Sequence, residues 1–253
     1  MSGLMREMCA RAHRLGIPLS VQLDLTYRCN ERCVQCYLDH HDHGEMTMVE
    51  ILDLLDQLAE AGVFFLILSG GEILLRRDPF EIIAHARRLT FNVKLKTNAV
   101  MVRRTKAERF AALGVDAVQI SVYSHRPAVH DAITKLPGSF RRTVEGARLL
   151  KECGVNVSFA NVLMKHNADD YAGVPALAAA EGVGYHVDPT NTPMMDGDRS
   201  ILDLNIDAAT RWEVFRDAAV VGNVEEFCAP PAGPLAEKDA LDTIPCSAGH
   251  TAC

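Results

Sequence analysis

At 253 residues, of which 48% are hydrophobic, the chain is long enough to bury a full core, and we expect one main domain. Its formal net charge is -7, and Lys and Arg are scattered rather than gathered on one face, which argues against nucleic acid as a partner. The sequence has no run of about 18 apolar residues and no cleavable signal pattern, so we predict a cytoplasmic protein without a membrane partner. Its eight cysteines are expected to serve metal or redox chemistry rather than disulfides.

Apolar periodicity and turn residues predict the elements in chain order. Residues 1–18 form a helix-like N-terminal segment to which we assign no function. An alternating strand starts at Leu19 and leads into a cysteine-containing loop, after which Thr47 and Glu50 have the spacing of a helix capping box. Thr105 and Glu108 have the same spacing and predict a second capped helix. Further strands are expected over 63–68, 91–97, 115–123, 155–164 and 183–187, and further helices over 78–89, 139–154, 169–181 and 207–220.

The order of these elements predicts the fold class. Six strands that alternate with helices imply right-handed βαβ crossovers and a parallel sheet. Eight strands do not fit, so we expect an α/β fold in which residues 19–222 form a partial (β/α)6 TIM-like barrel. Residues 223–253 are rich in proline and form a linker with a cysteine-bearing extension. The chain stops on Cys253, which suggests a fragment of a longer protein.

Three cysteines stand close together after the first predicted strand. Cys29, Cys33 and Cys36 fall within eight residues, and no fourth cysteine lies nearby. Three thiolates at this spacing can bind three irons of a cubane iron-sulfur cluster, whereas ferredoxin-type runs supply a fourth. The sequence therefore predicts a 4Fe-4S cluster with one open iron, which is a Lewis-acidic position for a ligand.

A structural zinc site is the alternative that these residues leave open. In that site the three cysteines would be completed by His40, His41 or His43. Structural zinc usually takes its ligands in two separated pairs, and this spacing does not follow that pattern. The segment from Asp39 to His43 is otherwise interpreted as a solvated loop, with adventitious metal binding as the second interpretation.

The run from Leu23 to Tyr37 resembles the signature of the radical S-adenosylmethionine superfamily, C-x3-C-x2-C followed by an aromatic residue. The run Ser69-Gly-Gly-Glu after the second strand resembles the GGE motif of the family, and Ala99 stands where the family usually has glycine. The resemblance covers residues 19–190 and implies a six-strand partial barrel. The contacts to S-adenosylmethionine that it implies are Tyr37, Gly70, Gly71, Glu72, Thr97, Asn98, Ser121 and Asn161.

The glycine pair and Glu72 also have an interpretation that does not depend on the family. Gly70 and Gly71 follow a buried strand, where glycine lets the backbone approach a ligand, and ligands in parallel α/β folds collect at that end. Glu72 supplies an anion for an ammonium group. An ordinary turn with an exposed glutamate is the alternative.

The resemblance also implies cofactors, partners and a mechanism. The open iron is expected to bind S-adenosylmethionine. One electron from the reduced cluster is then expected to cleave a carbon-sulfur bond of this cofactor, giving methionine and a 5'-deoxyadenosyl radical that abstracts a substrate hydrogen. The expected partners are an electron donor such as flavodoxin or ferredoxin, a peptide or small-molecule substrate and, in some members, a peptide-carrier protein. We assign no catalytic residue beyond the cluster ligands.

The last cysteines resemble the start of the SPASM extension, whose further cysteines hold auxiliary iron-sulfur clusters. Cys246 and Cys253 cannot hold a cluster alone. Either Cys228 and another ligand complete it, or the remaining ligands lie beyond residue 253, which we favour on the resemblance. Free thiols on a tail are the alternative.

Polar residues after the fourth and sixth strands are further candidates. The family often has a His-Asp pair at the positions of His125, His130 and Asp131. Two roles are open to these residues: an exposed or helix-capping role, and contact with substrate or cofactor. Asp188 and Asn191 belong to a polar loop that is a candidate substrate rim.

Together these features predict a radical S-adenosylmethionine enzyme of the SPASM-bearing type. The favoured reaction is maturation of a ribosomally made peptide or a peptide-derived cofactor, with formation of a carbon-carbon or carbon-sulfur bond. Sulfatase-type oxidation of a protein side chain and tailoring of a tetrapyrrole are alternatives within the superfamily. A zinc-bound structural or interaction module is the alternative of another class.

Overall fold

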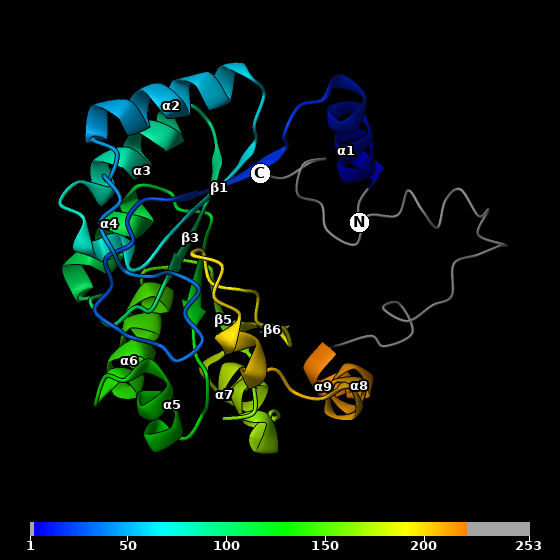
Figure 1. The fold of residues 1–253 in the computed structure, drawn as a ribbon. Coiled ribbons are helices and arrows are strands. Elements are labelled where there is room, and N and C mark those ends of the chain that lie inside the picture. Colours follow the sequence, from blue (N-terminus) through cyan, green and yellow to red (C-terminus); the bar gives the residue numbers. More distant parts are fainter. Residues whose placement is uncertain (1–2, 222–253) are drawn as a thin grey trace, which may run out of the picture.

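The fold is a curved sheet of six parallel strands, each followed by helical structure, in a computed structural model that describes residues 3–221 (Figure 1). The strands lie side by side in chain order: β1 (Ser20–Asp24), β2 (Phe65–Ser69), β3 (Asn92–Thr97), β4 (Ala117–Ser121), β5 (Val157–Val162) and β6 (Gly184–Asp188). The helices are α1 (Gly3–Leu15), α2 (Met48–Glu60), α3 (Pro79–Arg88), α4 (Arg104–Ala112), α5 (Pro127–Thr134), α6 (Ser139–Glu152), α7 (Gly173–Glu181), α8 (Ala208–Arg216) and α9 (Ala218–Val221). Short 3-10 segments are η1 (Ile73–Leu75), η2 (Ala168–Asp170) and η3 (Ser200–Leu204). This architecture confirms the predicted α/β class and the partial barrel.

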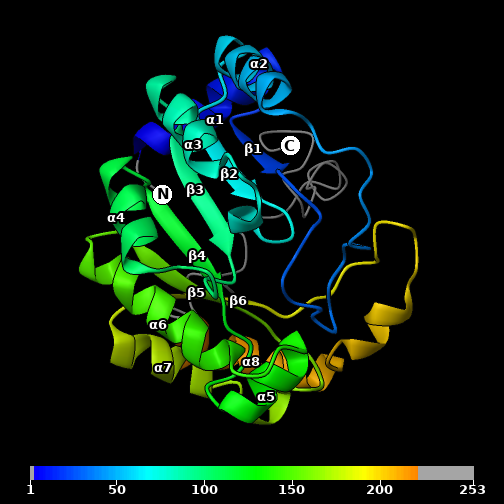
Figure 2. The ribbon, with the colours of Figure 1, turned by 90° about the vertical axis from the view of Figure 1, so that its left-hand side faces the viewer.

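Helices α2 to α7 lie along one side of the sheet, as Figures 1 and 2 show. Right-handed crossovers between neighbouring parallel strands place every connecting helix on the same face, so the sheet curves around its uncovered face. In Figure 2 the loop after β1, in blue, lies beside the loop after β6, in yellow, and the Met195 amide donates to the Tyr37 carbonyl at 2.9 Å. The loops after the first and last strands therefore meet across the open end of the sheet.

The core lies between the sheet and these helices. Strand residues that face the helices are fully buried, among them Leu66, Leu68, Val93, Leu95, Val118, Ile120 and Phe159. They pack with Ile51, Leu55, Ile82, Ile83, Phe110 and Leu150 from the helices. Burial of each such side chain contributes about 1.5–3 kcal/mol to folding, so this layer supplies much of the stability that fixes the strand ends.

Of the two predicted capping boxes, one is confirmed and one is wrong. Glu50 N donates to Thr47 Oγ1 at 3.3 Å and Thr47 N donates to Glu50 Oε2 at 2.8 Å, which closes the box at the start of α2. Helix α4 instead begins at Arg104, with Arg103 as its N-cap and no side-chain cap. Thr105 is therefore already inside the helix, where its hydroxyl cannot act as an N-cap.

Two further details differ from the sequence-based expectation. Helix α5, which starts with Pro127 at its first turn, was not predicted, because eight residues give little periodicity. The single helix expected over 207–220 is two helices, since Asp217 has an extended backbone (φ -81°, ψ 106°) between α8 and α9. Both differences lie outside the sheet.

No helix among residues 3–221 is long and apolar enough to cross a membrane. The predicted domain boundary at residue 222 stays a prediction. Cys228, Cys246 and Cys253 lie outside the described residues.

Candidate active site

The carboxyl ends of the strands open onto a cavity of about 370 Å³, and Cys29, Cys33 and Cys36 all line it. Most of the cofactor contacts that the sequence predicts line the same cavity, namely Tyr37, Gly70, Gly71, Thr97, Asn98 and Ser121. These residues come from the loop after β1 and from the ends of β2, β3 and β4. The structure therefore brings together residues that span 29 to 121 in the sequence.

Backbone hydrogen bonds and an ion pair hold the cysteine loop in place. Arg32 N donates to Thr134 O and Val34 N donates to Ile133 O, each at 3.0 Å, which attaches the middle of the loop to the end of α5. Before the first cysteine, Arg28 forms an ion pair with Glu45 at 2.9 Å. The cysteine loop thus runs from β1 to the helix that follows β4.

Gly70 and Gly71 allow the end of β2 to approach the start of the cysteine loop. Gly71 N donates to Thr26 O at 2.7 Å. A Cβ added to Gly70 would lie 2.3 Å from Thr26 O, and one added to Gly71 would lie 2.3 Å from Arg28 O. Gly70 also has φ +124°, which L-residues rarely adopt. The glycine pair was predicted to let a ligand approach the backbone closely. In the structure it also lets the backbone of Thr26 and Arg28 approach closely.

The three cysteines are free thiols and half-buried. Burial raises the pKa of Cys29 to about 12, and burial likewise raises the pKa of Cys33 and of Cys36 above the ordinary thiol value. Without a metal these groups are therefore protonated at neutral pH, and a metal that binds them must displace protons. The loop supplies Cys29 Sγ with one backbone donor, Glu31 N at 3.4 Å.

Glu72 is fully buried, and its carboxylate does not line the cavity. It accepts hydrogen bonds from Leu74 N at 3.0 Å, from Thr97 Oγ1 at 2.7 Å and from Asn98 N at 2.9 Å. Burial raises the pKa of Glu72, while these donors favour the charged form. The predicted anion for an ammonium group thus points away from the cavity in this structure, where it joins η1 to the end of β3.

Asn98 and Ala99 continue this end of β3. The Asn98 amide lies 3.8 Å from Cys29 Sγ and donates to Asn30 Oδ1 at 2.8 Å, so Asn98 contacts the cysteine loop directly. Ala99 has φ 58°, in the left-handed region that favours glycine. Ala99 therefore adopts the backbone conformation that would suit the glycine usual at this position of the family.

Asn161 is, after Glu72, the second predicted contact that does not line the cavity. It alternates along β5 with Val162, which lines the cavity, so the Asn161 side chain points to the other face. There its carbonyl oxygen accepts from Asn167 Nδ2 at 3.2 Å. Ser121 lies on β4 with its side chain toward the cavity.

Tyr37 lines the cavity and donates its hydroxyl to Asp24 Oδ2 at 3.0 Å. Burial, with Asp24 close by, raises the pKa of Tyr37 well above its ordinary value, so the phenol stays protonated and keeps donating. The contact of Tyr37 with S-adenosylmethionine that the resemblance implies stays a prediction.

Several polar residues of the cavity were not predicted. Lys96 lines it and donates to Gln22 Oε1 at 2.8 Å, and Glu31 and Gln35 line it from the cysteine loop. The signal for Lys96 was its alternation with Lys94 along β3, which places charged side chains on the uncovered face of the sheet. The predicted rim residues Asp188 and Asn191 also line the cavity, together with Thr190 and Thr192.

The residues around the cavity fit an iron-sulfur cluster better than a single zinc ion. Three soft thiol donors face one space. Within residues 3–221, the group of metal-ligating side chains whose donor atoms all lie within 4.8 Å of one another is Asp39, His41 and His43, without any cysteine. Three thiolates on one tetrahedral zinc ion would be about 3.8 Å apart. The geometry therefore favours the larger cubane.

His125, His130 and Asp131 have structural roles in the described residues. Asp131 caps α6 by accepting from Ser139 Oγ and Phe140 N, each at 2.9 Å. His125 pairs with Asp170 at 3.0 Å. His130 is fully buried, and its Nδ1 accepts from Tyr123 N at 3.2 Å, while its Nε2 has no partner.

His130 makes stability depend on pH. Burial lowers the pKa of His130 to about 4, from about 6.5 in an unfolded chain, so the unfolded chain binds the proton more readily. The free energy of unfolding should therefore fall as pH decreases from about 6.5 to about 4, by up to roughly 3 kcal/mol. Denaturant titrations across this range measure the slope. His130→Gln keeps an acceptor for Tyr123 N but does not titrate, so an equal slope in both proteins would contradict the assignment.

The fold and the cavity define a class of protein: parallel partial barrels in which three cysteines of the first loop share a cavity with glycines after the second strand. Residues 23–174 match the model of the Radical SAM superfamily, and the chain belongs to this family.

Curated relatives match about two thirds of the chain. The chain is 32% identical over 174 residues to "AdoMet-dependent heme synthase" of Methanosarcina barkeri, which covers 67% of this chain and 50% of that protein. It is 32% identical over 173 residues to "Mycofactocin maturase MftC" of Mycobacterium ulcerans, at 67% and 47% coverage. The chain thus spans about half the length of the curated relatives that it matches.

Solved structures share the fold. Streptococcus suis SuiB bound to its precursor peptide SuiA has a TM-score of 0.62 at 17% identity, covering 72% of this chain and 42% of SuiB. SuiB bound to S-adenosylmethionine gives the same TM-score at 16% identity, with 75% and 44% coverage.

Proposed function

We propose that this chain carries the catalytic core of a radical S-adenosylmethionine enzyme. The observation that supports it most is that Cys29, Cys33 and Cys36 line one cavity with the glycine pair and the end of β3. These cysteines would hold the 4Fe-4S cluster, and Gly70, Gly71 and Asn98 would contact S-adenosylmethionine. When bound, this pair of cofactors supplies a reducing electron and the radical that removes a substrate hydrogen.

The chain's own residues prepare the cavity for this chemistry. The half-buried Gly70–Gly71 turn holds the cysteine loop against β2. Glu72 fixes the hydroxyl of Thr97 and the main-chain N–H of Asn98. Leu38 and Tyr123 line the cavity with apolar surface and exclude water near the thiols. Lys96 and Asp188 place one charge of each sign on its walls, where a polar substrate would be oriented.

For the substrate, we infer a ribosomally made peptide or a peptide-derived cofactor. The relative named as a mycofactocin maturase and the SuiB structure with a precursor peptide support this class. A tetrapyrrole is the second candidate, because the relative named as a heme synthase is equally identical to this chain. Sulfatase-type oxidation has weaker support.

Partners and location follow from the same proposal. A one-electron donor such as flavodoxin or ferredoxin would reduce the cluster, and a peptide-carrier protein would present the substrate. Free cysteines in the cavity suit a reducing compartment, so we keep the cytoplasm as the proposed location. An auxiliary cluster at Cys246 and Cys253, less favourably with Cys228, also stays a proposal.

The activity is tested with anaerobically purified protein. We expect brown protein with sulfide, an absorption band that bleaches on dithionite, and 5'-deoxyadenosine formed from S-adenosylmethionine. Colourless protein loaded with zinc would contradict the proposal. With activity established, mass spectrometry of a candidate precursor peptide encoded beside this chain, compared with a porphyrin, separates the two substrate classes. A change confined to the porphyrin would reject the peptide.

A further inference from the structure

A second group of metal-ligating side chains lies outside the cavity of the cysteines. Asp39, His41 and His43 stand in the loop between the cysteines and α2, and their donor atoms all lie within 4.8 Å of one another. Asp39 Oδ2 is 2.7 Å from His43 Nε2 and 3.7 Å from His41 Nδ1. Two ligands bound about 2.1 Å from one ion lie about 3.0 Å apart at an octahedral angle and about 3.4 Å apart at a tetrahedral angle. The observed separations lie on either side of these values, so small side-chain rotations bring the three donors onto one ion.

The loop already orients two of these donors. His41 N donates to Asp39 Oδ1 at 2.9 Å, which leaves Asp39 Oδ2 to face the imidazoles. This hydrogen bond also holds the pKa of Asp39 below its usual range, so the carboxylate is charged. The His43 ring packs edge-on against Tyr27, with centroids 5.6 Å apart. An ion would therefore meet a carboxylate and an imidazole whose positions are set before it binds.

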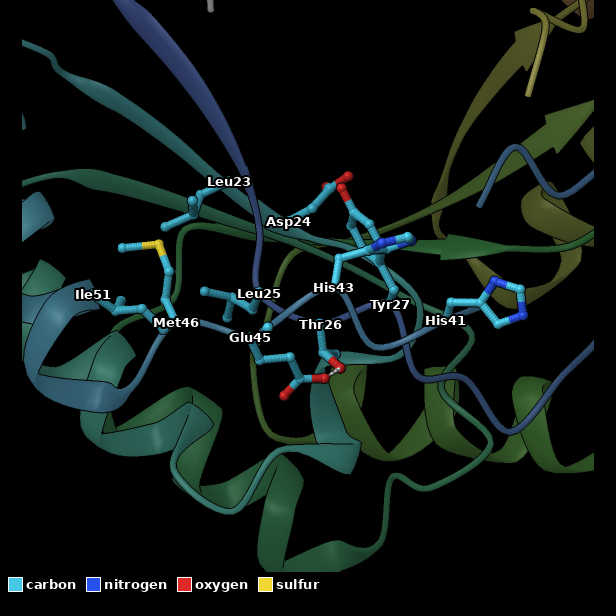
Figure 3. Close-up of a pocket in the computed structure, with 11 residues that line it drawn as sticks. Leu23, Asp24, Leu25, Thr26, Tyr27, His41, His43, Glu45, Met46 and Ile51 are labelled. Atoms are coloured by element: carbon cyan, nitrogen blue, oxygen red, sulfur yellow. Dashed lines mark hydrogen bonds between the residues drawn. The ribbon is translucent and has the colours of Figure 1, made fainter. Parts of the chain in front are cut away.

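His41 and His43 also line a second cavity, of about 250 Å³, with Thr26, Tyr27 and Glu45 (Figure 3). In Figure 3 the His43 ring lies beside Tyr27, and His41 stands at the edge of the group. The side chains of His41 and His43 are 80% and 56% exposed. Three protein ligands at such a place leave coordination positions open to water.

We propose that Asp39, His41 and His43 bind one divalent first-row transition ion, such as Zn²⁺. Two neutral imidazoles and one carboxylate are a donor set that suits such ions, whereas an all-oxygen set would favour Mg²⁺ or Ca²⁺. The ion would hold the 39–45 loop in one conformation beside the start of the cysteine loop. This site stands apart from the proposed cluster, and it does not depend on the proposed function.

The test uses Zn²⁺ as the probe and the full chain with its iron-sulfur cluster assembled, so that Cys29, Cys33 and Cys36 are occupied. Equilibrium dialysis followed by metal analysis compares the wild-type chain with the H41A/H43A variant. The matched control is His85→Ala. His85 Nε2 also lies 2.7 Å from a carboxylate oxygen, that of Asp56, but among the described residues no third metal-ligating side chain joins this pair. We expect the wild-type chain and the His85→Ala variant to retain one more zinc per chain than H41A/H43A, with at least tenfold tighter binding.

X-ray absorption at the zinc edge identifies the ligands of the retained ion. We expect a first shell of nitrogen and oxygen with the outer scattering of imidazole. Sulfur in the first shell of this zinc would overturn the proposal, because it would place the ion on cysteines. Equal zinc contents in all three proteins, including none in any of them, would overturn it as well.

Discussion

The rate of 5'-deoxyadenosine formation is expected to be at least about 100-fold lower in the Cys33→Ala variant than in the wild-type chain. Replacing residues that only support metal ligands already lowers metal affinity or activity 10-fold to 100-fold. Cys33 lines the cavity and packs beside the buried cluster of Tyr123, Ile133 and Met164. Removing its sulfur leaves two thiols of the loop, too few to hold three irons of a cubane. Iron and sulfide contents should fall together with the turnover of S-adenosylmethionine.

A second free thiol provides the control for this variant. Cys153 is also half-buried, but it lies at the end of α6, where its sulfur is 3.7 Å from an Arg104 nitrogen. Cys153→Ala should keep the iron content and the turnover of the wild-type chain. Retained turnover in Cys33→Ala would mean that the cluster is bound elsewhere.

The Gly70→Ala variant is expected to lose more stability than the Gly154→Ala variant. Two costs combine at this position: a positive φ, at about 1–3 kcal/mol, and overpacking against Thr26 O, at about 1–3 kcal/mol. The second cost is hard to relieve, because the atom at 2.3 Å belongs to the backbone and cannot rotate away. We expect a loss of about 3 kcal/mol or more, measured from denaturant and thermal midpoints, or no folded protein at all.

Gly154 separates the two costs. It has φ +82°, and a Cβ there would meet nothing within 4 Å, so Gly154→Ala carries the backbone strain alone. Its expected loss is about 1 kcal/mol. If Gly70→Ala were no more destabilising than Gly154→Ala, the close contact between β2 and the cysteine loop would not be a determinant of the fold.

Much of the fold could be predicted from the sequence, because the signals were local. Strand and helix alternate with clear periodicity, and right-handed crossovers then determine the parallel order β1 to β6. The capping box at Thr47 and Glu50 was predicted because both partners lie within four residues. The same spacing at Thr105 and Glu108 misled, because it fits equally well a helix that starts at Arg104.

The site was predicted less completely, because side-chain direction depends on neighbours distant in sequence. The cysteine spacing identified the loop, but it did not indicate that Glu72 turns inward to Thr97 and Asn98. Ser121 and Asn161 are both polar residues near strand ends, but their side chains point to opposite faces of the sheet. The register of β4 with β5, which pairs Ser121 with Ala160, determines these directions. Lys96 was overlooked because a lysine in a strand is ordinarily read as solvent-exposed.

The attachment of the cysteine loop to α5 has a consequence for how the domain unfolds. Through Arg32 N and Val34 N the loop connects the first strand with the helix that follows the fourth strand. The two halves of a half-open barrel could otherwise separate independently, since each strand pairs only with its neighbours. With the loop in place, opening either half breaks these hydrogen bonds and releases the cysteines from their arrangement. Cooperativity between the halves and retention of the cluster are therefore coupled, so a cluster held by all three cysteines would slow amide exchange on both sides of the sheet.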